Sequence, residues 1–217
     1  MNMKTFISCL ALTLAPFGGG FAYAGAAETP VTSVGSAVVS TVSVTDWSGF
    51  YAGVSYGFVQ DSMASYQNGA FGGNLFVGGD SFGGFAGYNF QRANFVYGAE
   101  LGYTAGPFAA REGFHTLTTQ DYLDLKLRLG YSMGKVLFYG FAGYSTATFY
   151  EDSVAPATTI DGLNYGVGVD YQITERIFAG VEYVARDLSG EFDQTDFPNW
   201  TFEGPSSSVN LRVGFSF

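Results

Sequence analysis

Residues 122–131 alternate strictly between two kinds of side chain. Leucines and Tyr131 occupy every second position, and the positions between them hold Tyr122, Asp124, Lys126, Arg128 and Gly130. An α-helix would spread these charges around its circumference, whereas a β-strand places all of them on one face. The segment therefore predicts a strand with one apolar face and one charged face.

Seven other segments share this period of two. They cover residues 49–58, 81–90, 95–104, 136–148, 163–171, 177–186 and 208–217. Most are close to the roughly ten residues that a tilted strand needs to cross a bilayer. The run over residues 136–148 is apolar on both faces, so the sequence leaves its orientation open.

The connections between these runs alternate in length. We expect tight turns at residues 91–94, 132–135 and 172–176, and long loops at residues 60–79, 105–120, 150–161 and 188–205. Short turns at one end and long loops at the other are typical of outer-membrane barrels. The predicted fold is all-β, an eight-stranded antiparallel up-and-down transmembrane β-barrel with both ends of its chain on the periplasmic side.

Three features indicate that the apolar faces point outward to lipid and the polar faces inward. Small residues are frequent on the polar faces, which relieves crowding inside a barrel of eight strands. Tyrosines gather near the strand ends, where their amphipathic rings suit the membrane boundary. The charges of the polar faces balance, although the chain as a whole has a net charge of −10.

The balanced charges are predicted to form an interior network, because a confined charge needs a partner. Its expected members are Glu100, Asp124, Lys126, Arg128, Asp170, Glu182, Arg186 and Arg212. The acids in excess, Asp61 among them, are expected in the loops.

The first residues predict export. Lys4 precedes an apolar stretch, and Ala22-Tyr23-Ala24 matches the small-x-small pattern of a signal-peptide cleavage site. We therefore expect residues 1–24 to be a signal peptide, residues 25–46 a flexible N-terminal lead-in, and residues 47–217 the barrel.

The composition of the chain limits its partners. Aromatic residues make up 18 % and charged residues only 13 %, about half the usual share, which suits β-structure in contact with an apolar phase. Cleavage after residue 24 would remove Lys4 and Cys9, leaving no cysteine and a net charge of −11. We expect no nucleic-acid binding, because that function needs a basic patch.

Several segments resemble one family of membrane proteins. Trp47-Ser48-Gly49-Phe50-Tyr51-Ala52-Gly53 is similar to the opening strand of small barrels related to the transmembrane domain of outer-membrane protein A, and more closely to porin-family surface antigens of alphaproteobacteria. Residues 84–91 resemble the second strand of these antigens, and Val181-Glu182-Tyr183 with Arg186-Asp187 resembles the seventh.

The final strand extends the resemblance to about residues 46–217. It is similar to the terminal signal read by the barrel-assembly machinery, which implies that role for Val213, Phe215 and Phe217. The resemblance implies an eight-stranded barrel in the bacterial outer membrane. It does not imply one function, since members serve as structural proteins, adhesins or ligand binders.

The sequence offers little for catalysis. His115 is the sole histidine, and it lies in an expected loop. We therefore predict that the protein is not an enzyme and has no catalytic residue, cofactor or metal site. Haem ligation by His115 is an alternative that the resemblance raises, because some relatives bind haemin.

The predicted role is that of a structural, surface-exposed envelope protein, with any recognition carried by the four long loops. The alternatives are a loop-mediated adhesin, a receptor for a ligand such as haemin, and a narrow pore of low conductance. Eight strands leave an interior filled by side chains, which argues against a wide channel. The expected partners are outer-membrane lipid and lipopolysaccharide, the barrel-assembly machinery, and a host or small-molecule ligand at the loops.

Overall fold

A computed structural model describes residues 45–217 apart from positions 107, 113–114, 152–153 and 195–196. The expected signal peptide and all but the last two residues of the expected lead-in therefore lie outside the described residues. The strands are β1 Gly49–Gln67, β2 Ala70–Arg92, β3 Phe95–Ala105, β4 Phe108–Glu112, β5 His115–Met133, β6 Val136–Glu151, β7 Val154–Gln172, β8 Ile177–Gln194 and β9 Phe197–Ser216. Within the described part of the chain there is no helix long and apolar enough to span a membrane.

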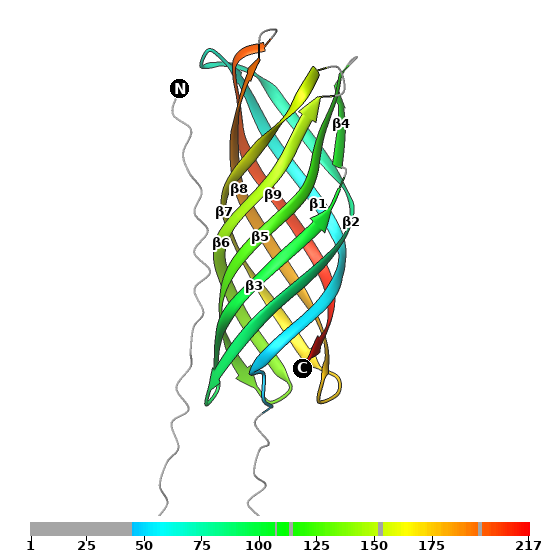
Figure 1. Cartoon of the computed structure of the whole chain (residues 1–217), viewed down its shortest axis with the longest axis vertical. Helices are drawn as coiled ribbons and strands as arrows, with labels where there is room; N and C mark the ends of the chain where they lie inside the picture. The colour runs from blue at the N-terminus through cyan, green and yellow to red at the C-terminus, as the bar shows by residue number, and fades with distance from the viewer. Residues whose placement is uncertain (1–44, 107, 113–114, 152–153, 195–196) are drawn as a thin grey trace, which may run out of the picture. The chain divides into compact units, whose positions relative to one another are not determined.

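These strands form one closed antiparallel barrel (Figure 1). Each strand pairs with its neighbours in the chain, β1 pairs with β9, and the pairing of β3 with β5 closes the wall. Strands β3 and β4 both pair with β5, so they are two parts of one barrel strand. The structure thus confirms the predicted eight-stranded barrel.

The apolar side chains form a band around the outside of the barrel. It includes the outward positions from Phe50 to Phe58 on β1 and from Leu123 to Tyr131 on β5. Leu127 remains 68 % exposed and Leu211 60 %, values that a water-soluble core residue would not have. The next outward positions toward the long hairpins are mostly polar: Gln60, Asp80, Asp121, Thr146, Asp161, Asp187 and Ser207.

The two ends of the barrel differ as the sequence predicts. At the short-turn end, β2 and β3, β5 and β6, and β7 and β8 are joined by turns of a few residues. Two of these turns contain positive backbone φ angles, at Ala93 and Gly134. The start of β1 and the end of β9 lie at this end as well, where the Phe217 amide donates a 2.9 Å hydrogen bond to the Phe50 carbonyl.

The prediction of long loops at the other end is wrong. Most of residues 60–79 belong to β1 and β2, which are joined only by Asn68 and Gly69, both with positive φ. The other three expected loops also lie largely in strands. Beyond the apolar band neither face of a strand meets lipid, so the alternation disappears from the sequence while backbone hydrogen bonding continues.

The backbone ladders of this hairpin end divide into two groups of strands, which the Thr158 hydroxyl still joins by donating to the Glu191 carbonyl at 2.9 Å. Pairing of β2 with β3 stops at Phe82↔Ala105, and pairing of β7 with β8 stops at Asp161↔Ser189. Among the described residues, the ladders that continue toward the hairpin tips join β8, β9, β1 and β2 in one group, and β4, β5, β6 and β7 in the other.

Candidate functional site

The barrel interior holds the residues with the most unusual environment. All eight charges predicted for the network are buried there: Glu100 on β3, Asp124, Lys126 and Arg128 on β5, Asp170 on β7, Glu182 and Arg186 on β8, and Arg212 on β9. None exposes more than 5 % of its surface. Their strands face each other across the lumen, which is why residues far apart in sequence meet.

Glu100 is the centre of the larger cluster. Its carboxylate accepts hydrogen bonds from Arg212 at 2.5 Å, Arg128 at 2.9 Å and Lys126 at 3.3 Å. The Tyr51 hydroxyl adds a fourth contact at 3.0 Å. A carboxylate with this many donors can remain ionised away from water.

The other two acids of this cluster share the same cations. Glu182 pairs with Lys126 and Arg212, each at 2.5 Å. Asp170 pairs with Arg128 at 3.0 Å and lies 3.6 Å from the Arg212 guanidinium. Three carboxylates therefore face three cations, and the cluster has no net charge.

A second, smaller cluster lies nearer the hairpin end. Arg186 donates two hydrogen bonds to Asp124, at 2.8 Å and 2.6 Å, in the two-pronged geometry that arginine forms with carboxylates. Ser145 donates to the same carboxylate at 2.5 Å, and Arg186 also donates to Ser208 at 3.3 Å. The buried Asp61 carboxylate adds a second acid on this side of the lumen, so two acids accompany one base here.

Aromatic rings fill the space between the charges. The Arg128 guanidinium lies 3.9 Å from the centre of the Tyr139 ring, and that of Arg212 lies 3.9 Å from the Phe85 ring. The Tyr139 hydroxyl donates to Glu182 at 3.0 Å. Glycine makes room for such rings: a Cβ at Gly168 would approach Tyr139 to 2.3 Å.

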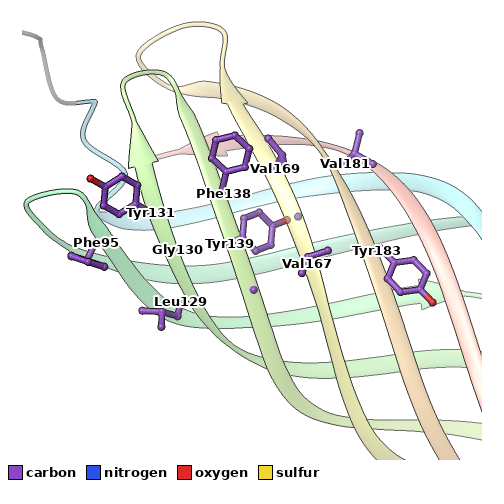
Figure 2. Close-up of a pocket in the computed structure, with 12 residues that line it drawn as sticks. Phe95, Leu129, Gly130, Tyr131, Phe138, Tyr139, Val167, Val169, Val181 and Tyr183 are labelled. Carbon is purple, nitrogen blue, oxygen red and sulfur yellow. The ribbon is translucent and has the colours of Figure 1, made fainter. Parts of the chain in front are cut away.

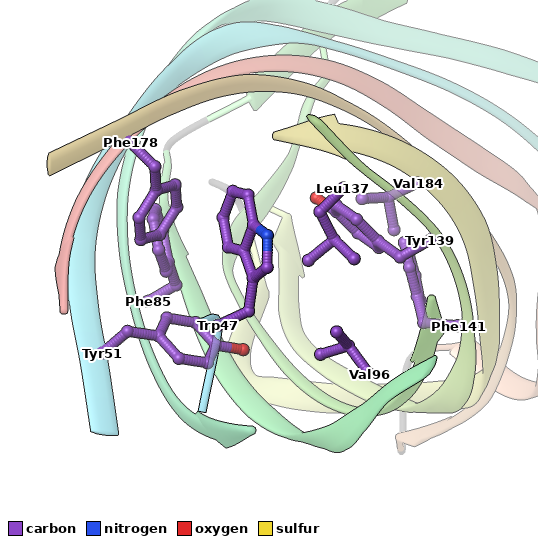
Figure 3. Close-up of a cluster of buried hydrophobic side chains, with 9 residues drawn as sticks. All are labelled: Trp47, Tyr51, Phe85, Val96, Leu137, Tyr139, Phe141, Phe178 and Val184. Atoms are coloured by element: carbon purple, nitrogen blue, oxygen red, sulfur yellow. The ribbon is translucent and has the colours of Figure 1, made fainter. Parts of the chain in front are cut away.

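An apolar layer around Trp47 and Phe178 lies at the short-turn side of the charges, and Phe85 and Tyr139 of the same buried cluster lie among them (Figure 3 shows the cluster). Trp47 precedes β1 and inserts its ring among those of Tyr51, Phe85 and Phe178, so that only 5 % of it is exposed. The Trp47 amide donates a 2.7 Å hydrogen bond to the Gln91 side chain, which fixes the chain at this point. Together the charged clusters and this layer occupy the lumen.

Sequence reasoning missed the aromatic part of the interior. Tyr51 and Tyr122 did fall on polar faces, which was the available signal, but Trp47 precedes the first alternating run. The expectation that Asp61 lies in a loop is wrong. Only 1 % of Asp61 is exposed, and the Tyr122 hydroxyl donates a 2.5 Å hydrogen bond to its carboxylate. Asp61 is an inward residue of β1 just beyond Phe58, the last residue of the apolar band on this strand. The sequence there no longer alternates, so it does not show that Asp61 points inward.

Little free space remains beside the network. An interior cavity lined by Lys126, Glu182 and Arg212 measures about 20 Å³. That volume holds about one water molecule. Solute-sized passage would therefore require side chains of the network to move.

The other residues singled out in the sequence lie on the surface or at a hairpin. Val213, Phe215 and Phe217 point outward from the end of β9. His115 begins β5, where it pairs with Glu112 across a hairpin. Among the described residues, no group of His, Cys, Asp and Glu could hold a metal ion.

Two segments match the letters Gly-x-Ser-x-Gly of hydrolase nucleophile elbows, at residues 53–57 and 130–134. A nucleophile elbow requires a sharp turn from a strand into a helix. The first segment lies within β1, and the second lies at the end of β5 before the turn into β6. Neither has the required geometry.

Two tyrosine–aspartate pairs mark the hairpin-side edge of the apolar band. The Tyr103 hydroxyl donates to Asp121 at 2.6 Å, and Tyr144 donates to Asp161. Asp121 also accepts a 2.8 Å hydrogen bond from the Gly106 amide. The Tyr103 hydrogen bond, followed by that of Gly106, holds the pKa of Asp121 below its ordinary value.

An apolar outer band around a closed, charge-paired interior defines a transmembrane β-barrel of the outer-membrane type. The comparisons with known proteins agree with this class. Residues 29–217 match the model of the outer membrane protein beta-barrel domain family, and the chain belongs to that family. It is accordingly a protein of the bacterial outer membrane.

Two relatives and two solved structures illustrate the similarity. The 22 kDa outer membrane protein of Rhizobium leguminosarum bv. viciae is 29 % identical over 88 % of this chain and 83 % of its own length. The 25 kDa outer-membrane immunogenic protein of Brucella canis is 25 % identical over 79 % and 78 %.

The solved structures share the fold at low sequence identity. OprG from Pseudomonas aeruginosa is 15 % identical with a TM-score of 0.56, covering 80 % of this chain and 99 % of its own. Neisserial surface protein A is 14 % identical with a TM-score of 0.51, covering 78 % and 98 %.

Proposed function

We propose that this protein is a closed structural barrel of the outer membrane that presents its long hairpins at the cell surface and conducts no solutes. The observation that carries the proposal is the filled lumen. Six charges in the larger cluster pair with one another, and the aromatic layer around Trp47 lies beneath them. An interior filled by side chains, with a neutral larger cluster, favours anchorage over transport.

Planar-bilayer recording tests this role. We expect the wild-type protein to give no large, stable openings. The double variant Glu100→Ser, Arg212→Ser removes one acid and one base, keeps charge parity and empties part of the lumen, so it should conduct measurably more. Asp187→Asn, on the outer surface, is the control and should behave as wild type. Large stable openings in wild-type protein would exclude the closed-barrel role.

We infer that the short-turn end faces the periplasm and the hairpin end faces the outside, the usual arrangement of such barrels. Single cysteines can report this orientation, because Cys9 is the sole cysteine of the sequence. Asn68→Cys, in the β1–β2 turn, should react with an impermeant thiol reagent in intact cells. Lys135→Cys, in a short turn, should react only after the cells are opened. The reverse labelling pattern would show that the barrel has the opposite orientation in the membrane.

Recognition by the hairpins is a second candidate function. The strands extend beyond the apolar band, and the described outward positions there carry acids such as Asp187, Glu191 and Glu203. The similar protein from Brucella is named an immunogenic protein, which agrees with an exposed surface. Shortening individual hairpins should abolish host-cell or ligand attachment without loss of the barrel; unchanged attachment would leave only the structural role.

Val213, Phe215 and Phe217 are the residues we expect the barrel-assembly machinery to read, and lipid and lipopolysaccharide are the expected surroundings of the outer band. His115→Ala should leave haemin binding and membrane lipid composition unchanged. A loss of haemin binding in that variant would favour the haemin-receptor alternative, and altered lipid composition would favour an enzyme.

A further inference from the structure

The outer face of the barrel carries a groove of about 760 Å³ on β5, β6, β7 and β8, with Phe95 of β3 at its edge (Figure 2). Its lining includes Leu129, Tyr131, Phe138, Gly140, Val167 and Val169. Gly140 is an outward position of β6, with Leu129 directly opposite on β5 and Val167 directly opposite on β7. Because Gly140 has no side chain, the backbone of β6 forms the floor and its larger neighbours form the walls.

The position of the groove matches the depth of one lipid leaflet. It lies within the apolar band, and β6 runs from Gly140 back to the turn at Lys135. That stretch is roughly 17 Å long at about 3.3 Å per residue, or roughly 13 Å along the membrane normal for a strand tilted by about 40°. This depth is similar to one leaflet, which is half of a hydrocarbon core about 30 Å thick. The groove therefore lies in the leaflet on the short-turn side.

The charge of the barrel surface also differs between its ends. Among the side chains that the structure describes, the exposed cations are Arg92, Lys135 and Arg176, and all three lie in or beside the short turns. Outward acids such as Asp161 and Asp187 lie toward the hairpin end, and the short-turn end carries two exposed acids of its own, Asp46 and Glu175. Lys135 occupies the turn that joins β5, which carries Leu129, to β6, which carries Gly140, so an anion at this end of the groove would meet a positive charge.

We propose that this groove binds one acyl chain of an anionic phospholipid from the leaflet on the short-turn side, with the lipid phosphate at Lys135. The apolar walls take the chain, and the ammonium group of Lys135 selects the headgroup. The site is on the outer face, so it does not depend on whether the closed interior conducts.

Native mass spectrometry of the detergent-purified protein tests the site with two lipids of identical chains, phosphatidylglycerol and phosphatidylcholine. We expect wild-type protein to retain phosphatidylglycerol preferentially. Gly140→Leu fills the groove and should lower that retention at least fivefold. Gly84→Leu is the matched control, since both glycines point outward and an added Cβ would lie 3.5 Å or 3.6 Å from its nearest neighbour. The control should retain lipid as the wild type does.

The headgroup contact is tested separately. Lys135→Gln should reduce the preference for phosphatidylglycerol over phosphatidylcholine, and Lys135→Arg should keep it. Heat-shifted electrophoretic migration establishes that each variant is folded before lipid is measured. Equal retention by Gly140→Leu and Gly84→Leu would overturn the proposal. So would a wild-type dimer that Gly140→Leu dissociates, because the groove would then be an interface between two copies of the chain.

Discussion

Arg212 is the residue whose removal should most disturb the barrel interior. It lies 2.5 Å from Glu100, 2.5 Å from Glu182 and 3.6 Å from Asp170, and 2 % of it is exposed. Arg212→Met keeps an apolar side chain against the Phe85 ring but leaves three carboxylates facing Lys126 and Arg128 alone. Breaking a buried pair in this way costs about 3–5 kcal/mol of unfolding free energy.

Urea unfolding in lipid vesicles measures this cost directly. Asp187→Asn removes one exposed charge on the outer surface and should change the unfolding free energy by less than about 0.5 kcal/mol. The double variant Glu182→Gln, Arg212→Met restores equal numbers of acids and bases. It should therefore cost less than the sum of the two single variants, with a coupling of about 1–3 kcal/mol.

The reasoning would be refuted if Arg212→Met and Asp187→Asn had the same unfolding free energy. Strictly additive single variants would also contradict it, because the charges of the larger cluster would then act independently. The heat-shifted migration of the two single variants on gels offers a second comparison, and the Arg212 variant should unfold at the lower temperature.

Three further outcomes follow from the fold. Gly168→Val should lower the unfolding free energy by about 1–3 kcal/mol through overpacking, because its Cβ would lie 2.3 Å from a Tyr139 ring that Arg128 and Glu182 hold in place. Gly84→Ala on the outer face should be nearly neutral, and urea unfolding distinguishes the two variants. Replacing residues 64–73 by a two-residue turn should leave heat-modifiable migration on gels intact, because the removed residues of β1 and β2 pair with each other outside the apolar band. Loss of the folded barrel in this variant would contradict the expectation. Phe217→Ala should slow membrane assembly in pulse-labelled cells. The unfolding free energy of the assembled barrel should stay within about 1 kcal/mol of wild type, because the side chain lies outside and the backbone amide of residue 217 still donates to the Phe50 carbonyl. Normal assembly kinetics would remove Phe217 from the assembly signal.

The alternation of residues 122–131 was enough to predict the strand, whereas its orientation came from the small residues, the balanced charges and the tyrosines of the whole set of strands. The charges there cannot face hydrocarbon, so Asp124, Lys126 and Arg128 could only point inward, as the structure has them. The same logic predicted the outward position of Leu211. Wherever a strand inside a bilayer has one polar and one apolar face, its sequence predicts which side chains point to the lumen and which to lipid.

The run over residues 136–148 shows where that logic fails. Both of its faces are apolar, and only the barrel decides that Tyr139 and Phe141 point inward. They fit because Gly168 and Gly166 on the neighbouring strand leave space beside them. The expected loops failed for a related reason, since backbone pairing beyond the membrane needs no alternation of side chains.

The sequence by itself determined the number of membrane-crossing strands, their apolar faces and the eight charges of the predicted network, while the buried position of Asp61 came from the structure. The tertiary structure decided which charges meet, because barrel closure and strand register bring Arg212 of β9 to Glu100 of β3. It also decided the insertion of Trp47 into the lumen, the length of the hairpins and the groove at Gly140. Period and polarity are local properties of a chain, whereas partners across a lumen and the shape of a wall depend on how its strands are aligned.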